Sequence, residues 1–359
     1  MRRSAYALIR LEHLTHNLNI LRSFIPKSKI ISVVKADAYG HGLAKTAHAL
    51  TQTDAFAVAC AQEAVELRSA SILHPIICLQ GFSNESELKI IAESNVQPVI
   101  HSEHQIKLLQ SFSLNQSLQV WLKVDTGMGR LGFSPETITE KYQQLNDIQQ
   151  VSKIRLMTHF ANADLLDDDS CERQLQLFNE ATANLPDCQK SAANSAASLA
   201  YSKSHFEWVR PGLCLYGISP FQVEKSHPDT SELKPVMSLR APLISIKSLK
   251  QGDHIGYGST YTCDQDMRVG IAAIGYADGY PRALETSVNV SINGHLVPIL
   301  GRVSMDMVAV DLTSIHADIG DDIELWGDEI SVSEVASAAN TISYDLLCGI
   351  AGRVHRIYE

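Results

Sequence analysis

The sequence has no run of apolar residues long enough to cross a membrane. A transmembrane helix needs about 20 consecutive, mostly apolar residues, and every apolar stretch of this 359-residue chain is much shorter. The basic residues Arg2 and Arg3 precede an apolar stretch that Arg10 and Glu12 interrupt, whereas a secretory signal needs a longer one. We therefore expect neither a membrane span nor a secretory signal, and a cytoplasmic location.

Positive charge is also scarce. Lys and Arg number 30 against 40 Asp and Glu, which gives a formal net charge of −10. Nucleic-acid-binding proteins concentrate basic residues on one surface, and no long basic run occurs here, so we expect no nucleic-acid partner. Apolar residues make up 45% and charged residues 19% of the chain, which is the composition of a globular protein rather than a disordered one.

The patterns of a disulfide framework or a metal site are missing as well. The seven cysteines are an odd number, lie far apart and form no C-x-x-C pair, so we expect reduced, mostly buried thiols. The clusters 101–104 (HSEH) and 167–169 (DDD) lack a recognised ligand spacing, and no metal is expected. A G-x-S-x-G motif is absent too, which argues against a hydrolase site of that type.

Short β-branched stretches alternate with helical stretches through the first two thirds of the chain. Strands are predicted at 30–34, 55–60, 75–79, 96–100, 119–124, 154–159, around 191 and at 208–216. Helices are predicted between them, for example at 44–51, 62–69 and 104–109. A strand every 20 to 35 residues or so, each followed by a helix, is typical of a parallel (β/α)₈ barrel.

The pattern changes near residue 237, where strands become frequent and turn dipeptides separate them. Residues 288–292 and 295–299 flank Asn293-Gly294, which predicts a hairpin on a type I′ turn. The predicted fold is therefore α/β, with an N-terminal (β/α)₈ TIM-type barrel (1–230) followed by a mostly β C-terminal domain (231–359). The first ten or so residues are candidates for pairing with the C-terminal domain.

Lys35 is the first candidate for chemistry. It directly follows a strongly apolar predicted strand, and reactive residues of such barrels lie at the C-terminal ends of strands. Burial there disfavours the charged ammonium and lowers the pKa, which makes a lysine amine a better nucleophile. An isolated lysine in this position more often extends its charged end into solvent, so the surrounding residues decide between the two interpretations.

These surroundings resemble a known family. The segment 33–42 (VVKADAYGHG) is similar to the pyridoxal phosphate attachment segment of bacterial alanine racemases, a barrel-type family. Further similar segments follow along nearly the whole chain: 123–132 (KVDTGMGRLG), 158–161 (THFA), 194–196 (NSA), 210–212 (RPG), 256–261 (GYGSTY), 274–279 (IGYADG), 301–306 (GRVSMD) and 340–344 (NTISY). Ser304 stands where many relatives carry Cys, and His355 where Pro is common.

The resemblance implies pyridoxal phosphate-dependent racemisation of L- and D-alanine, which supplies D-alanine for peptidoglycan. Such a reaction needs two acid–base groups on opposite faces of the substrate and an electron sink. The resemblance assigns the α-proton of D-alanine to Lys35 and that of L-alanine to Tyr257. An ordinary phenol has a pKa near 10, and in the family a histidine, here His159, interacts with this tyrosine. Arg210 would face the pyridine nitrogen.

The remaining site residues also follow from the resemblance. The cofactor-binding set comprises Lys35, Tyr39, Ser195, Arg210, Gly212, Leu213 and Tyr344. The substrate contacts comprise Arg130 and Met305, the carbamylated lysine is Lys123, and the narrow entrance is lined by Tyr276 and Arg282. Because these residues come from both predicted domains, the resemblance implies a homodimer in which each C-terminal domain completes the site of its neighbour.

Three other functions share some of these features. A racemase of broader specificity remains open, because the width of the pocket cannot be read from the sequence. A barrel-type decarboxylase of diamino acids usually carries a Gly-rich phosphate loop and cysteine–aspartate motifs that we do not find. A non-catalytic pyridoxal phosphate-binding barrel lacks a second β domain, whereas this chain has one that contains Tyr257.

Overall fold

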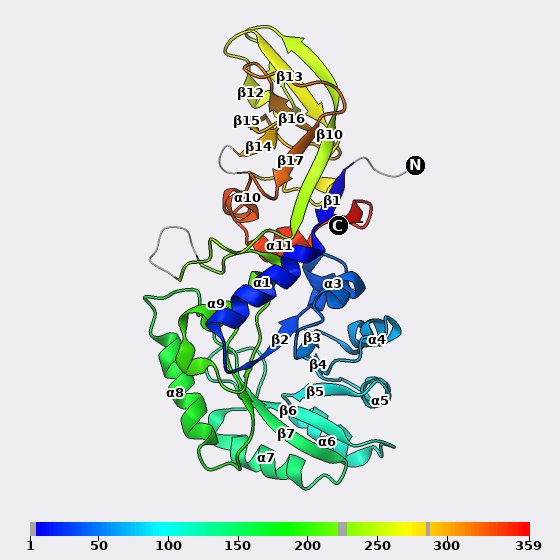
Figure 1. The fold of residues 1–359 in the computed structure, drawn as a ribbon, viewed down its shortest axis with the longest axis vertical. Coiled ribbons are helices and arrows are strands. Elements are labelled where there is room, and N and C mark those ends of the chain that lie inside the picture. The colour runs from blue at the N-terminus through cyan, green and yellow to red at the C-terminus, as the bar shows by residue number, and fades with distance from the viewer. Residues whose placement is uncertain (1–4, 222–227, 285–287) are drawn as a thin grey trace.

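The computed structural model describes residues 5–221, 228–284 and 288–359; Arg2 and Arg3 lie outside these ranges. The chain forms two domains, a closed barrel of parallel strands in the lower half of Figure 1 and a mostly β domain in the upper half. The predicted fold class is therefore confirmed.

The barrel strands follow the predicted apolar stretches. They are β2 (Lys29–Val33), β3 (Ala55–Val58), β4 (Ile76–Cys78), β5 (Val96–Ile100), β6 (Leu118–Lys123), β7 (Val151–Met157), β8 (Lys190–Ser191) and β9 (Trp208–Val209). The barrel closes where β2 pairs with β9. The prediction of a strand over 208–216 is wrong beyond Val209: Pro211 has no N–H for a strand ladder, and the chain enters the 3₁₀ helix η3 (Leu213–Tyr216).

Helices surround the barrel. They are α1 (Leu11–Phe24), α3 (Leu43–Ala49), α4 (Ala61–Ser69), α5 (Glu85–Glu93), α6 (Glu103–Ser111), α7 (Ile138–Asn146), α8 (Ser170–Thr182) and α9 (Ser195–Ala200). Helix α1 precedes the first barrel strand and contacts α3 and α9, so it fills the place of a helix after β9. Its buried residues Leu14, Leu18 and Leu21 recur every three or four positions, as in an amphipathic helix.

The C-terminal domain is built on an eight-stranded sheet with the order β13-β16-β15-β14-β17-β10-β1-β18. Its strands are β1 (Tyr6–Ile9), β10 (Met237–Leu249), β13 (Met267–Ala272), β14 (Asn289–Ile292), β15 (His295–Leu300), β16 (Val308–Asp311), β17 (Asp322–Trp326) and β18 (His355–Tyr358). The predicted hairpin is confirmed: β14 pairs with β15, and both turn residues, Asn293 and Gly294, have positive φ.

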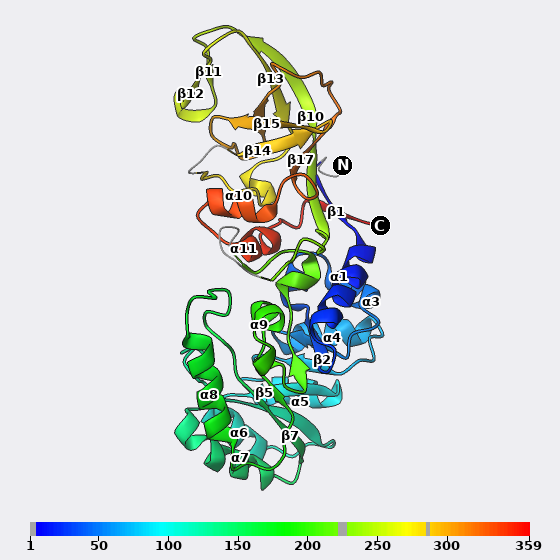
Figure 2. The same cartoon turned by 60° about the vertical axis from the view of Figure 1, so that its left-hand side comes forward.

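Smaller elements complete this domain. They are the two-stranded ribbon β11 (His254–Ile255) and β12 (Tyr261–Thr262), and the helices α10 (Val332–Ala338) and α11 (Ser343–Cys348). In both Figure 1 and Figure 2 the ribbon lies at the end remote from the barrel, whereas α11 lies next to the barrel. The ribbon and α11 therefore occupy opposite ends of the domain.

Strand β1 joins the two domains. It pairs with β10 in antiparallel and with β18 in parallel orientation, and the chain then enters α1 of the barrel. The barrel is thus connected to the C-terminal sheet both before its first strand and after its last one, which restricts how the two domains can move.

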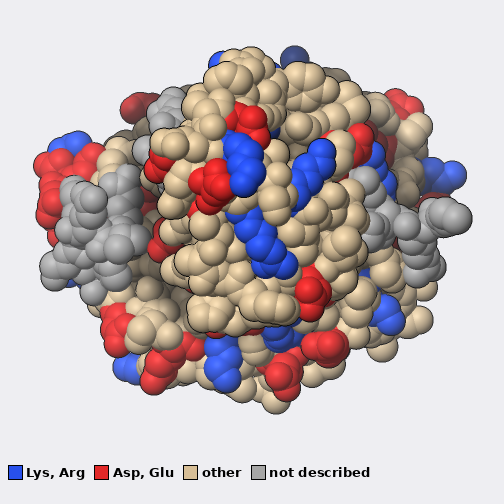
Figure 3. Space-filling view, turned by 90° about the horizontal axis from the view of Figure 1, so that it is seen from above, with Lys and Arg blue, Asp and Glu red and all other residues tan. Residues whose placement is uncertain are grey.

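At the end of the C-terminal domain remote from the barrel, acidic and basic side chains are interspersed among uncharged ones (Figure 3). All seven cysteines are free thiols, and of these only Cys348 on α11 is exposed. None of the helices in the described ranges is long and apolar enough to span a membrane.

Asn17 on α1 provides a test of how the domains are held together. Its side-chain amide is buried, donates to the carbonyls of Leu215 (3.0 Å) and Lys234 (2.9 Å), and accepts from the Lys234 N–H (2.8 Å). We expect Asn17→Ala to lower the free energy of unfolding by about 3 kcal/mol, because three backbone groups lose their partner. Urea unfolding measures this, with the exposed Asn19→Ala on the same helix as the control; equal effects would contradict the prediction.

Candidate active site

Lys35 begins a left-handed turn, α2 (Lys35–Tyr39), directly after β2. Residues 36–39 all have φ between 52° and 55°, a conformation that costs non-glycine residues roughly 1 kcal/mol or more each. The Glu63 carboxylate accepts hydrogen bonds from the N–H groups of Ala36 and Ala59, both at 2.7 Å. Glu63 thereby fastens the strained turn to the end of β3. Glu63 was not identified from the sequence, because its only sequence signal is its place as an acidic residue in the first turn of α4.

The C-terminal domain holds the same turn from the other side. A Cβ atom at Gly40 would lie 2.2 Å from the Leu347 carbonyl oxygen of α11, so only glycine allows this approach of the two backbones. Arg356 of β18 donates through Nε to the Gly40 carbonyl at 2.7 Å. The position of Lys35 therefore depends on both domains of its own chain.

Three tyrosines pack together beside this turn. The Tyr39 ring centroid lies 4.7 Å from that of Tyr216 and 5.6 Å from that of Tyr344 on α11. The Tyr216 hydroxyl donates to the Val33 carbonyl of β2 at 3.1 Å. Burial raises the pKa of all three phenols above the ordinary value. They consequently remain protonated and can act as hydrogen-bond donors.

Arg210 follows β9, and its buried guanidinium makes several hydrogen bonds. Its Nη1 donates to the Ser191 hydroxyl at 2.5 Å, and its Nη2 lies 2.6 Å from the Thr158 carbonyl oxygen and 3.3 Å from His159 Nδ1. Nε makes no hydrogen bond among the described residues. The guanidinium is therefore held rigidly, and its Nε remains available for a ligand. Burial lowers its pKa to about 10, so it stays charged at neutral pH.

Close to Arg210, two loop residues form a small cradle. The Gly212 N–H donates to the Ser195 hydroxyl at 2.8 Å, and a Cβ atom at Gly212 would lie 2.5 Å from the Tyr39 hydroxyl. Ser195 begins α9, and Leu213 is buried at the start of η3. The cradle thus brings hydroxyl and backbone N–H groups from three barrel loops together.

The mouth of the barrel concentrates positive charge. Burial, followed by the charge of Arg130, lowers the pKa of Lys35. Burial and the charges of Arg210 and Arg130 lower the pKa of Lys123 to about 8. His159 is affected by burial and by all four cations, and its pKa lies well below 6.5. The five side chains are therefore close enough to interact, and the site favours anionic ligands.

Hydrogen bonds hold the backbone of His159 and the side chain of the residue before it, Thr158. The hydroxyls of Thr126 and Thr158 are 2.7 Å apart, and Gln174 donates through Nε2 to the His159 carbonyl at 3.2 Å. Thr126 and Thr158 lie within the similar segments 123–132 and 158–161, although no role was assigned to them, whereas Gln174 on α8 belongs to no motif and was missed.

The other predicted site residues lie on the C-terminal domain, where their side chains are exposed. Tyr257, in the turn between β11 and β12, is 70% exposed; Tyr276 is 38% and Met305 53% exposed. Arg282 is exposed as well. Because the β11–β12 ribbon lies at the end of the domain remote from the barrel (Figures 1 and 2), one chain does not bring Tyr257 and Lys35 together.

The loops of Tyr276 and Met305 are nonetheless fixed to each other. The Tyr276 and Ala277 N–H groups donate to the carbonyls of Ser304 (3.1 Å) and Met305 (3.0 Å). The Arg353 guanidinium also forms ion pairs with one acid from each loop: Nε lies 2.8 Å from the buried Asp278 carboxylate, and Nη2 lies 2.6 Å from that of Asp306. The two loops therefore form one rigid, exposed surface.

Comparison with known proteins decides the family. The alanine racemase N-terminal domain model matches residues 9–220 and the C-terminal domain model matches residues 236–358. The chain belongs to the alanine racemase family. It is 45% identical to an alanine racemase of Coxiella burnetii over 98% of both chains, and 43% identical to one of Vibrio cholerae over 99% of this chain and 98% of the relative.

Solved alanine racemase structures agree over the full length. The biosynthetic enzyme of Pseudomonas aeruginosa superimposes with a TM-score of 0.94 and the Acinetobacter baumannii enzyme with 0.93; each is 39% identical and covered completely, as is this chain. Family membership confirms the resemblance from which the site residues were predicted. No cluster of three or more potential metal-binding His, Cys, Asp or Glu residues occurs within the described ranges.

The lowered pKa of His159 predicts how stability depends on pH. Below about pH 6.5 the unfolded chain protonates this histidine while the folded chain does not, so its contribution makes the folded state less stable as pH falls. The slope reaches about 1.4 kcal/mol per pH unit until the folded pKa is reached. His41, fully buried with a pKa lowered to about 4, acts in the same direction.

Urea unfolding between pH 7 and pH 5 measures this effect. We expect the loss of stability to be smaller in His159→Gln than in the unmodified protein, with the exposed His48→Gln on α3 as the control. Identical slopes for all three proteins would contradict a neutral His159 in the folded state.

Proposed function

We propose that this protein interconverts L-alanine and D-alanine with pyridoxal phosphate as its cofactor, as a homodimer in the bacterial cytoplasm. The observation that carries the proposal is the full-length membership in the alanine racemase family, combined with Lys35 on a strained turn at the barrel mouth. D-Alanine made in this way would be available for peptidoglycan.

The residues at the barrel mouth fit this cofactor. Its aldehyde needs an amine with an accessible neutral form, and burial beside Arg130 favours the neutral form of Lys35. Its phosphate needs donors and no crowding, which the cradle of Ser195 and Gly212, with the hydroxyls of Tyr39 and Tyr344, can provide. The surrounding cations also suit a dianionic group. When bound, the cofactor acts as an electron sink that makes the α-proton of the amino acid acidic.

Arg210 would hold the ring nitrogen through Nε, the one nitrogen without a partner among the described residues. An arginine keeps its own proton at neutral pH, so it donates a hydrogen bond to the ring and leaves the ring nitrogen without a proton. The bonds to Ser191 and Thr158 hold the guanidinium plane in position. A weaker electron sink of this kind favours rapid proton return over side reactions.

Two side chains would move the proton. The Lys35 amine, once free, takes the α-proton of D-alanine, and the Tyr257 hydroxyl serves the opposite face, on which L-alanine carries its proton. The substrate carboxylate would be bound by Arg130 and by the backbone of Met305. Tyr276 and Arg282 would line a narrow entrance that favours the small side chain of alanine.

Lys123 would be carbamylated. Its pKa of about 8 leaves an appreciable neutral fraction near neutral pH, and a neutral amine adds carbon dioxide to form a carbamate and release a proton. The change replaces a buried cation with an anion beside Arg130 and Arg210, which removes the repulsion among these charges and orients Arg130 toward the substrate.

The homodimer is supported by the separation of the two proposed bases. Tyr257 is exposed at the far end of its domain, while Lys35 is partly buried at the barrel mouth. A second copy that places Tyr257, together with the rigid surface around Tyr276 and Met305, on the barrel mouth would complete the site. Two-fold symmetry would then form two equivalent sites per dimer.

Tyr257→Phe tests the two-base reaction. Removal of the hydroxyl keeps the ring but removes the proton carrier, so racemisation should fall by about 10²- to 10⁴-fold. In D₂O the variant should still exchange the α-proton of D-alanine through Lys35, but not that of L-alanine. Chiral chromatography and proton NMR measure the two quantities.

Tyr261→Phe on the neighbouring strand is the matched control, because within the described residues its hydroxyl donates only to Met267 Sδ (3.7 Å). It should retain full activity. Exchange of both enantiomers by the Tyr257 variant would contradict the assignment of one base to each face. Faster turnover of a larger amino acid than of alanine would instead support a racemase of broader specificity.

A further inference from the structure

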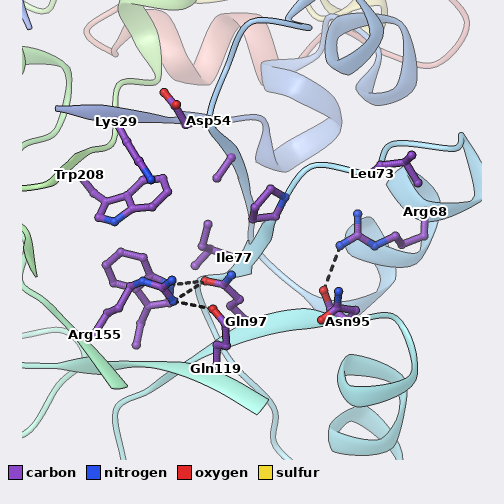
Figure 4. A pocket seen from close by; sticks show the side chains of 13 residues that line it. Lys29, Asp54, Arg68, Leu73, Ile77, Asn95, Gln97, Gln119, Arg155 and Trp208 are labelled. Atoms are coloured by element: carbon purple, nitrogen blue, oxygen red, sulfur yellow. Dashed lines mark hydrogen bonds between the residues drawn. The ribbon is translucent and has the colours of Figure 1, made fainter. Parts of the chain in front are cut away.

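A second cavity opens at the opposite end of the barrel, among the N-terminal ends of the strands (Figure 4). Its volume is about 330 Å³, and its charged and amide-bearing lining residues are Lys29, Asp54, Arg68, Asn95, Gln97, Gln119 and Arg155. None of the residues proposed for racemisation lines it. The interior of such a barrel is normally filled by packed side chains. The fold alone therefore does not explain an open, polar cavity at this end.

Arg155 on β7 is the most unusual residue of this cavity. It is only 7% exposed, and its Nε and Nη1 donate to the side-chain oxygens of Gln189 (2.9 Å), Gln119 (3.0 Å) and Gln97 (3.3 Å). All these acceptors are neutral amides. Arg155 has no carboxylate partner among the described residues, and its Nη2 makes no hydrogen bond there. A buried charge of this kind is costly unless an opposite charge approaches it.

Two tryptophans partly compensate this charge. The Arg155 guanidinium lies 5.4 Å from the ring centre of Trp121 and 6.0 Å from that of Trp208, within the range of cation–π attraction. Lys29 uses the same Trp208 ring, with its Nζ 5.1 Å from the centre. Two cations therefore gather around one indole ring and repel each other.

The remaining charges leave the cavity positive. Arg68 lines its other side and donates to backbone carbonyls, including that of Asn95 (3.0 Å). Asp54 is the only acid among the described residues that line it, and its carboxylate is already engaged by Arg22 (3.0 Å) and the Ile30 N–H (2.9 Å). The cavity thus presents three cations against one acid that has its own partner.

We propose that this cavity binds a small oxyanion, with Arg155 Nη2 and Lys29 Nζ as its charged donors. Phosphate and carboxylate groups both match an arginine beside a lysine, and the volume accommodates inorganic phosphate or a short dicarboxylate. Binding would offset the repulsion between Lys29 and Arg155 and stabilise the barrel at the end opposite its catalytic mouth.

Isothermal titration calorimetry of the cofactor-loaded protein tests the proposal. Inorganic phosphate and succinate are titrated separately at low ionic strength, with saturating alanine to keep the substrate site filled. We expect one site per chain that binds phosphate, succinate or both. The anion with the higher affinity shows whether the natural ligand carries a phosphate or a carboxylate group. Lys29→Gln should weaken binding about tenfold, the loss of one charged hydrogen bond.

Lys107→Gln, on the exposed side of α6, removes the same charge outside the cavity and should leave the affinity unchanged. Arg155→Met should abolish binding. If this variant does not fold, Lys29→Gln still tests the proposal, because Lys29 is exposed and its replacement leaves the core unchanged. The proposal is overturned if neither anion binds, or if Lys29→Gln and Lys107→Gln bind equally well. In that case the glutamine oxygens and the two tryptophans are sufficient to stabilise the Arg155 charge.

Discussion

The turn that carries Lys35 is the constraint on which the rest of the site depends. Four consecutive residues in the left-handed region would not keep this conformation by themselves. Glu63 fastens the turn to the barrel on one side, and α11 and β18 press against it on the other, where Gly40 allows backbone contact. The joining of β1 to the C-terminal sheet keeps these elements in place, so that the two-domain architecture itself positions the reactive amine.

A concentration of positive charge is the second determinant. Lys35, Lys123, Arg130 and Arg210 surround a histidine that their charges and burial keep neutral. Such a site is electrostatically unfavourable when empty and favourable once it holds a phosphate and a carboxylate. The same electrostatics prepare Lys123 for carbamylation by lowering its pKa. Binding, protonation and modification at the barrel mouth would then share one physical cause.

Much of this arrangement could be predicted from the sequence, and the failures have physical reasons. Apolar stretches predicted most of the barrel strands, because buried parallel strands are continuously apolar; the short β8 (Lys190–Ser191) was placed only by the alternation of strands and helices. The last strand was predicted too long, and the C-terminal helices α10 and α11 were not predicted, because short helices depend on tertiary packing more than on local pattern. The left-handed turn could not be predicted, since alanine and tyrosine ordinarily avoid this conformation. Motifs identified the site residues, whereas the supporting Glu63 and Gln174 belong to no motif.

The central claim is that each active site combines the barrel of one chain with the C-terminal domain of another. Mixed dimers of Lys35→Ala and Tyr257→Phe chains test it most directly, because each variant alone is inactive. Random exchange of subunits makes about half of the dimers mixed, and each of these holds one intact site, so about a quarter of the unmodified activity should return. If mixing restores no activity although mixed dimers form, both bases must come from one chain, and the account is wrong.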